Sequence, residues 1–325
     1  MLPGLVPVAA AQCGAFTAPQ SYAAGYSDDE VRARVRAGRW VALRRGVYAT
    51  REEVEQVADG EARHRLLAAA GLLALEPGAV LSHISAATLH RVDLRTSPGL
   101  VVHATRPEGP PRAYRALRVH QLPLAPAEVA AVGALSVTAP ARTVVDCAQQ
   151  LPFADAVVIA DSALAQGVVG EAALREAAAQ GLPRHARRVD RVVSFADGRS
   201  ESAGESFARV VMVEQGLPTP DLQVDLHDAA GLIGRVDFLW RAERVVGEFD
   251  GQLKYRTDPA ALWREKLRED RLREAGYEVA RFTWADLTDH PEAVGERVRA
   301  ACARSQTRQT ASPPRAAGWL WRPGG

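Results

Sequence analysis

The stretch GRVDFLWRAERVVGEFDG, residues 234–251, decides how the carboxyl-terminal third of the chain folds. Two runs of alternating side chains flank Ala242 and Glu243, which is the pattern of a β-hairpin with a short turn. Pairing about that turn places Asp237 opposite Glu248, and alternation adds Asp250 to the same face. The other face then carries the apolar side chains, namely Val236, Phe238, Trp240, Val245 and Phe249. We expect one face to be core and the other to hold three carboxylates.

Like charges on neighbouring strands, with Cβ atoms about 5 Å apart, destabilise a sheet unless something compensates them. A hard divalent cation, Mg²⁺ or Mn²⁺, would do so by taking carboxylate oxygens while it keeps places for water and phosphate. Such an ion lowers the pKa of a bound water and stabilises charge on phosphorus. We therefore predict Asp237, Glu248 and Asp250 as metal ligands. The open alternative is a solvated strand face held by Arg235 and Arg244.

Three further side chains are candidates for catalysis around these acids. Glu205 adds a carboxylate from the preceding helix, although Ser202-Ala-Gly-Glu205 is also a capping-box pattern. Lys254 and Lys266 are placed to orient water or to neutralise a phosphate, although a charge-rich helix is usually a solvated face.

The sequence around the hairpin predicts a mixed α/β domain over residues 199–303. Helices are expected at 201–215, 259–275 and 291–303, and strands at 222–227, 233–240, 244–250 and 278–284. The tail at 304–325, rich in Ser, Thr, Gln, Pro and Gly, is expected to be disordered.

The motif order in this segment resembles a known family. ESxxE, VDF, ExDG, EKxREDxLRxxG and VxRFTWxDL follow one another between Glu201 and Leu287. This order is similar to the DUF559 group, and through it to very-short-patch-repair endonucleases of the PD-(D/E)XK superfamily. The resemblance implies a mixed central sheet flanked by helices, with Glu205, Asp237 and Glu248 as active-site acids.

The sequence departs from that family at one position. Asp250 stands where the superfamily carries the lysine of its ExK motif. Either Lys254 or Lys266 supplies that charge, or catalysis is weak or lost. Two functions follow: a Mg²⁺-dependent DNA endonuclease, or a DNA-binding regulator with a catalytically weak or inactive nuclease fold.

The amino-terminal segment, residues 12–50, predicts a winged helix-turn-helix. Thr17 caps a helix ending near Gly25, and Ser27-Asp28-Asp29-Glu30 is a capping box that opens a second helix. Two short strands follow, at 40–43 and 46–48. Six arginines gather on the second helix and the hairpin tip, where phosphates would be met: Arg32, Arg34, Arg36, Arg39, Arg44 and Arg45.

Residues 17–50 resemble the winged helix of AbiEi-type antitoxins of type IV toxin–antitoxin systems. An α+β middle domain at 60–182 is similar to their carboxyl-terminal part. The resemblance implies DNA as a partner and adds a cognate toxin as a second one. The open alternative is a small module that only packs against its neighbour.

Composition sets few further limits. The 40 basic and 39 acidic side chains give a formal net charge of +1, so only clusters can indicate nucleic acid. Three widely spaced cysteines favour a reducing cytoplasm, and no apolar run is long enough for a membrane span. The eight histidines lack HxxxH and HExxH spacing, which argues against zinc.

Overall fold

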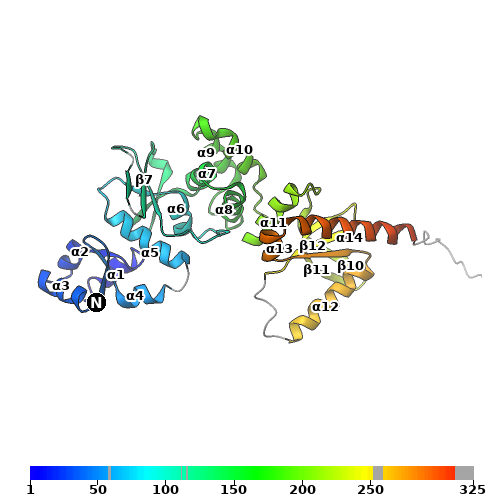
Figure 1. The fold of residues 1–325 in the computed structure, drawn as a ribbon, viewed down its shortest axis with the longest axis horizontal. Helices are drawn as coiled ribbons and strands as arrows, with labels where there is room; N and C mark the ends of the chain where they lie inside the picture. Colours follow the sequence, from blue (N-terminus) through cyan, green and yellow to red (C-terminus); the bar gives the residue numbers. More distant parts are fainter. Residues whose placement is uncertain (58–59, 111, 115, 252–258, 312–325) are drawn as a thin grey trace, which may run out of the picture. The chain divides into compact units, whose positions relative to one another are not determined.

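The computed structural model describes residues 1–57, 60–110, 112–114, 116–251 and 259–311 (Figure 1). The chain is a mixed α/β protein, as the sequence indicates, and divides into two compact units, Met1–Ser206 and Phe207–Gly325. The segments expected at 12–50 and 60–182 both lie within the first unit. Among the described helices, none combines the length and hydropathy that crossing a bilayer requires.

The first unit begins with a three-stranded sheet and short helices. Thr17 and Ser27 form complete capping boxes, which confirms both N-cap predictions. The strands pair antiparallel in the order β1–β3–β2, and buried Phe16 and Trp40 meet edge to face at 4.7 Å in the core. The elements are α1 (Val6–Ala10), β1 (Phe16–Thr17), α2 (Ala18–Ala23), α3 (Asp28–Arg36), β2 (Trp40–Arg44), β3 (Val47–Thr50) and α4 (Arg51–Gln56).

A six-stranded mixed sheet follows in the order β6–β7–β5–β4–β9–β8. The pairs β5–β7 and β4–β9 are parallel, and the other pairs are antiparallel. Its elements are α5 (Gly60–Leu73), β4 (Val80–Leu81), α6 (His83–His90), β5 (Val102–Arg106), β6 (Arg112–Tyr114), β7 (Leu117–Gln121), β8 (Val129–Val132) and β9 (Leu135–Thr138).

Helices complete the first unit. They are α7 (Pro140–Gln150), α8 (Phe153–Ala165), α9 (Glu171–Ala179) and α10 (Ala186–Phe195), while α11 (Ala203–Glu214) crosses into the second unit. Short 3-10 turns lie at Pro126–Glu128 and Pro183–His185.

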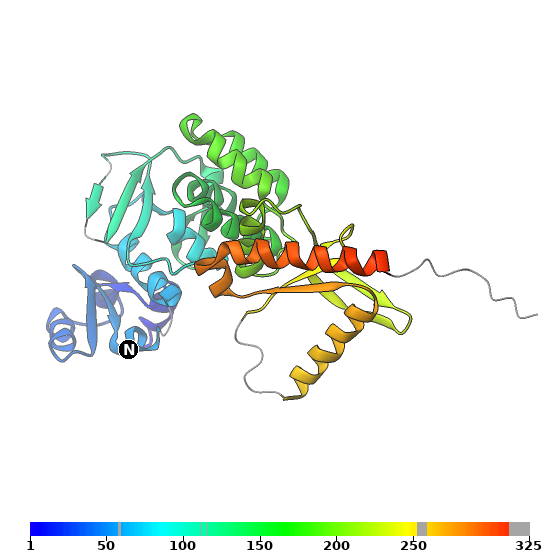
Figure 2. The same cartoon turned by 45° about the vertical axis from the view of Figure 1, so that its right-hand side comes forward.

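The second unit is built on a four-stranded sheet in the order β10–β11–β12–β13. The first two pairings are antiparallel and the last is parallel. Figure 2 shows α12 and α14 on opposite sides of this sheet. The elements are β10 (Asp221–Asp228), β11 (Gly231–Trp240), β12 (Val245–Phe249), α12 (Pro259–Glu274), β13 (Glu278–Phe282), α13 (Trp284–Asp289) and α14 (Pro291–Ala311).

Three details of this unit differ from the expectation. The strand expected to reach Trp284 ends at Phe282, because Thr283 and Asp286 form a capping box that opens α13. Residues 304–311 of the expected tail are helical, as the last turns of α14. Residues 312–325 lie outside the described part of the chain.

The hairpin has the predicted register, but the expectation of one apolar and one acidic face was wrong. Phe238 pairs with Gly247 and Leu239 with Val246, as the turn requires. Leu239 and Val246 share the acidic face and are buried against Leu272 of α12. Both faces are therefore core, because α12 covers the side that was expected to hold only carboxylates.

Candidate functional site

The carboxylate of Glu205 closes the first turn of its own helix. It accepts hydrogen bonds from the Glu201 backbone amide at 2.8 Å and from the Ser202 hydroxyl at 2.7 Å. The Ser202 hydroxyl in turn accepts from the Glu205 amide at 3.2 Å. The Ser202 half of the capping box is therefore present, while the Glu205 carboxylate accepts from the amide of Glu201, one residue before the N-cap.

Asp237 lies where the two hairpin strands separate. The backbone ladder between β11 and β12 ends at Phe238 and Gly247, so Asp237 and Glu248 are not ladder partners. The Asp237 carboxylate instead accepts a hydrogen bond from the Phe249 amide at 2.8 Å. The side chain therefore replaces a backbone acceptor at the end of the ladder.

Glu248 is buried in a network of charges supplied by α12 and β13. Arg268 Nη2 lies 2.7 Å from Glu248 Oε1, and Arg281 Nη2 lies 3.4 Å from Oε2. Arg281 also contacts Glu265 at 2.6 Å and Glu269 at 3.1 Å. Burial raises the pKa of Glu248, while the two arginines oppose that rise. Two guanidinium groups therefore supply the positive charge that we had expected from a metal ion.

Asp250 and Lys266 line a depression of about 370 Å³ whose wall includes members of the Glu248 network. Asp250 is half-buried, whereas Lys266 is exposed and lies 5.9 Å from the ring centroid of exposed Trp263. Glu265, Glu269, Asp270, Arg273 and Arg281 complete the lining. Lys254, the other candidate lysine, lies outside the described residues.

These residues do not fit a Mg²⁺ ion. Within the described part of the chain, Asp237, Glu248 and Asp250 do not form a group of ligand atoms within 4.8 Å of one another. The Glu248 carboxylate already faces two arginines, and the position of the usual lysine carries a third acid. A hard cation needs several oxygens free to converge on it, whereas one Asp237 oxygen accepts from the Phe249 amide and the Glu248 oxygens face Arg268 and Arg281.

Two of the six arginines expected to contact DNA have structural partners. Arg34 stacks its guanidinium 4.6 Å from the ring centroid of Tyr26 and 5.8 Å from that of Trp40. Arg44 donates a hydrogen bond to the carbonyl of Ala116 at 3.0 Å, and burial lowers its pKa. Both hold the small sheet in place.

The other four arginines are exposed on α3 and the β2–β3 hairpin. Arg32 forms an ion pair with Asp28 one turn earlier, at 2.7 Å. Arg36, Arg39 and Arg45 have no acidic partner among the described residues. These three exposed cations lie at the end of α3, in the turn that follows it and at the hairpin tip.

The structure also brings together three residues that the sequence did not single out. The side chains of His83, His103 and His120 offer ligand atoms that all lie within 4.8 Å of one another. Each histidine comes from a different element, so a local motif such as HxxxH could not have predicted the cluster. The argument against zinc rested on local spacing, which does not detect a cluster assembled from three elements.

Comparisons with known proteins found relatives of similar sequence. It is similar to the uncharacterized protein Rv2248 of Mycobacterium tuberculosis (strain ATCC 25618 / H37Rv) and the uncharacterized protein MT2308 of strain CDC 1551 / Oshkosh. In each case 33% of 215 aligned residues are identical, over 66% of this chain and 78% of the relative. No protein-family model matches the chain.

One solved structure, the crystal structure of RV2827C protein from Mycobacterium tuberculosis, is also similar at a low level. It shares 19% sequence identity and a TM-score of 0.35, over 69% of this chain and 85% of that one. This similarity is too low to imply a common fold.

Proposed function

The chain belongs to the same family as the two uncharacterized Mycobacterium tuberculosis proteins, and we propose that it is a DNA-binding regulator. In this proposal the amino-terminal 50 residues are a winged helix that holds the DNA. The carboxyl-terminal unit has a nuclease-type element order without a competent Mg²⁺ site. The resemblance to AbiEi-type antitoxins extends the proposal to a cognate toxin as partner.

The observation that carries the proposal is the order of the first six elements. Helix α1, strand β1, helices α2 and α3, and the β2–β3 hairpin follow one another, and β1 pairs with β3 in a β1–β3–β2 sheet. This order supports a winged helix-turn-helix, a module in which the second helix of the pair enters the major groove. Here that helix is α3, and the β2–β3 hairpin is the wing.

The charge distribution indicates which parts of this module would meet DNA. The first turn of α3 carries Asp28, Asp29 and Glu30, so this end of the helix repels phosphates. Arg36, Arg39 and Arg45 lie at the other end and on the wing. We expect phosphate contacts from these three, which would position the helix without reading sequence directly.

A binding titration tests the proposal. Full-length protein is titrated into a fluorescent duplex in EDTA at several salt concentrations. The variant Arg36→Ala/Arg45→Ala should bind the duplex more weakly. Its plot of log K against log [salt] should also be less steep by about two, since each lost phosphate contact reduces the steepness by about 0.9. A matched control, Arg175→Ala/Arg187→Ala, removes the same charge from exposed positions of α9 and α10. Equal slopes for both variants and the wild type would exclude α3 and the wing as the DNA contact.

The carboxyl-terminal unit supports the part of the proposal that gives it a nuclease-type element order without a competent Mg²⁺ site. Its order α11–β10–β11–β12–α12–β13, with a final parallel strand, agrees with the mixed sheet that the DUF559 resemblance implies. Arg268 and Arg281 neutralise Glu248, and Glu205 caps its own helix. A unit of this kind would act as a scaffold or as a surface for a partner.

A Mg²⁺-dependent DNA endonuclease is the second candidate, and one observation favours it. Glu248 Oε1 is buried without a hydrogen-bond donor among the described residues, although Arg268 lies close to it. Such an oxygen is a place where a cation could be taken up if the arginine moved away. The test is supercoiled plasmid incubated with the protein and Mg²⁺ or Mn²⁺. Metal-dependent nicking that Asp237→Ala and Glu248→Ala abolish would establish the nuclease and displace the regulator.

A further inference from the structure

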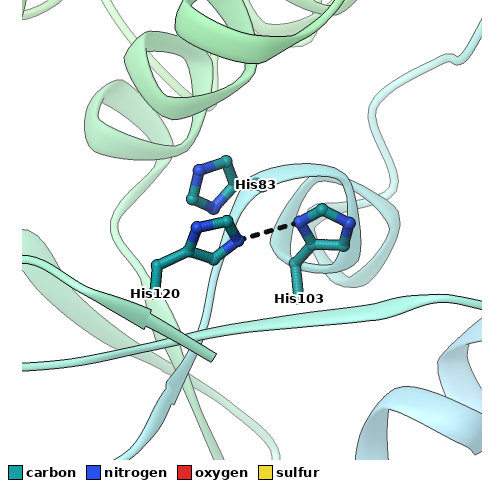
Figure 3. A group of neighbouring side chains, drawn as sticks. All are labelled: His83, His103 and His120. Carbon is teal, nitrogen blue, oxygen red and sulfur yellow. Dashed lines mark hydrogen bonds between the residues drawn. The ribbon is translucent and has the colours of Figure 1, made fainter. Parts of the chain in front are cut away.

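Three histidines meet at one end of the six-stranded sheet (Figure 3). His103 on β5 and His120 on β7 belong to parallel neighbours whose register places Thr105 beside His120. The two imidazoles are therefore diagonal neighbours on one face of the sheet. His83 is the first residue of α6, and Ser82 is the single residue between it and the end of β4. His83 and His103 are buried, and His120 is half-buried.

The spacing of the ring nitrogens suits a single bound ion. His103 Nδ1 lies 3.1 Å from His120 Nε2, while two nitrogens bound to one tetrahedral zinc ion lie about 3.3 Å apart. The His83 ring stacks on that of His120 with centroids 4.0 Å apart and planes 23° from parallel. A turn of the His83 ring out of this stack would complete a three-nitrogen site, because its ligand atom is already within 4.8 Å of the other two.

The surroundings keep these nitrogens available as ligands. His83 Nδ1 lies 2.9 Å from the Ser82 hydroxyl, which leaves Nε2 to face its neighbours. Ser82 is itself fixed by the Thr105 hydroxyl at 2.8 Å, so the orienting group is held in place.

The backbone at His83 is a second, independent sign of a functional site. Its φ is +53°, in the left-handed region that residues with a side chain rarely adopt. Such a conformation costs roughly 1–3 kcal/mol and persists where the surrounding structure demands it, often at ligand sites. Here it places the His83 ring over His120 at the start of α6.

The cluster opens on one side into a pocket of about 550 Å³. His83 and His120 form part of its wall, together with the basic side chains Arg118 and Arg184. Gln121, Gln149 and Gln150 also line it. An ion held by the three histidines would therefore keep one coordination position facing solvent, beside two guanidinium groups that favour an anion.

We propose that His83, His103 and His120 bind one zinc ion, with a fourth coordination position open to this basic pocket for water or an anionic ligand. Neutral imidazoles as the whole ligand set favour zinc over the hard cation Mg²⁺. In the hydrogen bond between His103 Nδ1 and His120 Nε2 one of the two nitrogens carries a proton. Zinc binding would move that proton to the other nitrogen of the same ring, so that each bound imidazole has its single proton on the nitrogen that faces away from the ion. No arginine of α3 or the wing is among the three proposed ligands, so zinc binding can hold whether or not the proposed DNA binding does.

Zinc titration of the untagged full-length protein by calorimetry tests the proposal. We expect one ion per chain, and at least about a 100-fold loss of affinity in His120→Gln, since even loss of a group that orients a ligand costs 10- to 100-fold. Ser82→Ala should lower affinity about tenfold for that reason. The matched control His90→Gln replaces a half-buried histidine of α6 that contacts the Thr138 carbonyl instead, and it should bind zinc as the wild type does.

A second measurement needs no variant and so does not depend on how a substituted chain folds. Crystals of the wild-type protein grown with Zn²⁺ should show an anomalous peak at the zinc edge among the three imidazoles. Zinc bound elsewhere, an absent peak, or equal affinity in His120→Gln and the wild type would each overturn the assignment.

Discussion

Replacing Arg268 by alanine tests whether arginines occupy the place of a metal ion beside Glu248. The substitution removes the guanidinium that lies 2.7 Å from Glu248 Oε1 and also donates to the Arg235 carbonyl at 2.6 Å. Removing one partner of a buried ion pair costs about 3–5 kcal/mol. Arg281 remains 3.4 Å from the other oxygen, so we expect Arg268→Ala to lose about 2–4 kcal/mol of unfolding free energy.

Urea denaturation of the full-length protein measures this loss, and Arg273→Ala is the matched control. Arg273 lies on the same helix and pairs with Glu269 and Asp270, but its side chain is 53% exposed. Its removal should cost no more than about 1 kcal/mol, as for other surface pairs. Adding Glu248→Gln to Arg268→Ala should recover part of the loss, because the buried charge is then gone.

The same variant has a pH dependence whose sign follows from Glu248. Burial raises the pKa of this carboxyl in the folded state, so the folded form binds its proton more tightly than the unfolded form. The free-energy cost of burying the ionised Glu248 carboxylate therefore disappears as pH falls through its folded-state pKa. We expect the difference in unfolding free energy between Arg268→Ala and the wild type to become smaller as pH is lowered below neutral. Two results would refute the idea that Arg268 neutralises Glu248. One is that Arg268→Ala loses no more unfolding free energy than Arg273→Ala, and the other is that its difference from the wild type increases in acid.

Other variants test the core, a helix cap and the histidine cluster. Gly247→Ala should cost about 1–3 kcal/mol by thermal unfolding, because the new Cβ would lie 3.0 Å from the Trp240 ring and 3.1 Å from Phe238 Cβ; an unchanged melting temperature would contradict this packing. The bonds that Asp286 accepts from Arg297 and Thr283 hold its pKa well below its usual range, so its stabilising effect should be present at neutral pH and lost in strong acid. Asp286→Asn should accordingly lower stability near neutral pH but not in acid, as urea titrations at both pH values would show. Zinc at about 100 times its Kd should stabilise the wild type by about 2.7 kcal/mol in calorimetry and leave His120→Gln unaffected; equal shifts would place the ion elsewhere.

Local patterns predicted the parts of this fold that depend on local chemistry. The hairpin register followed from its turn, since pairing about Ala242 and Glu243 requires the observed partners Phe238 and Gly247. The capping boxes at Thr17 and Ser27 begin helices where their spacing indicates. The same signal at Thr283 and Asp286 was present in the sequence but was hidden inside an expected strand.

Long-range contacts explain what the sequence did not predict. Arg268 and Arg281 lie beyond the hairpin in the chain and reach Glu248 only because α12 folds back over the sheet and β13 adds to its edge. The histidine cluster needs the parallel pairing of β5 with β7, which places His103 and His120 on one face. Periodicity within one segment contains no information about which distant segment will cover it.

The measurement that tests the central proposal most directly is a protection footprint on the DNA upstream of the protein's own coding sequence, first in EDTA and then after Mg²⁺ is added. A DNA-binding regulator predicts a protected region in EDTA that Arg36→Ala/Arg45→Ala weakens, with both strands intact after Mg²⁺. Absence of protection without metal, or strand cutting on addition of Mg²⁺ that Asp237→Ala abolishes, would contradict it.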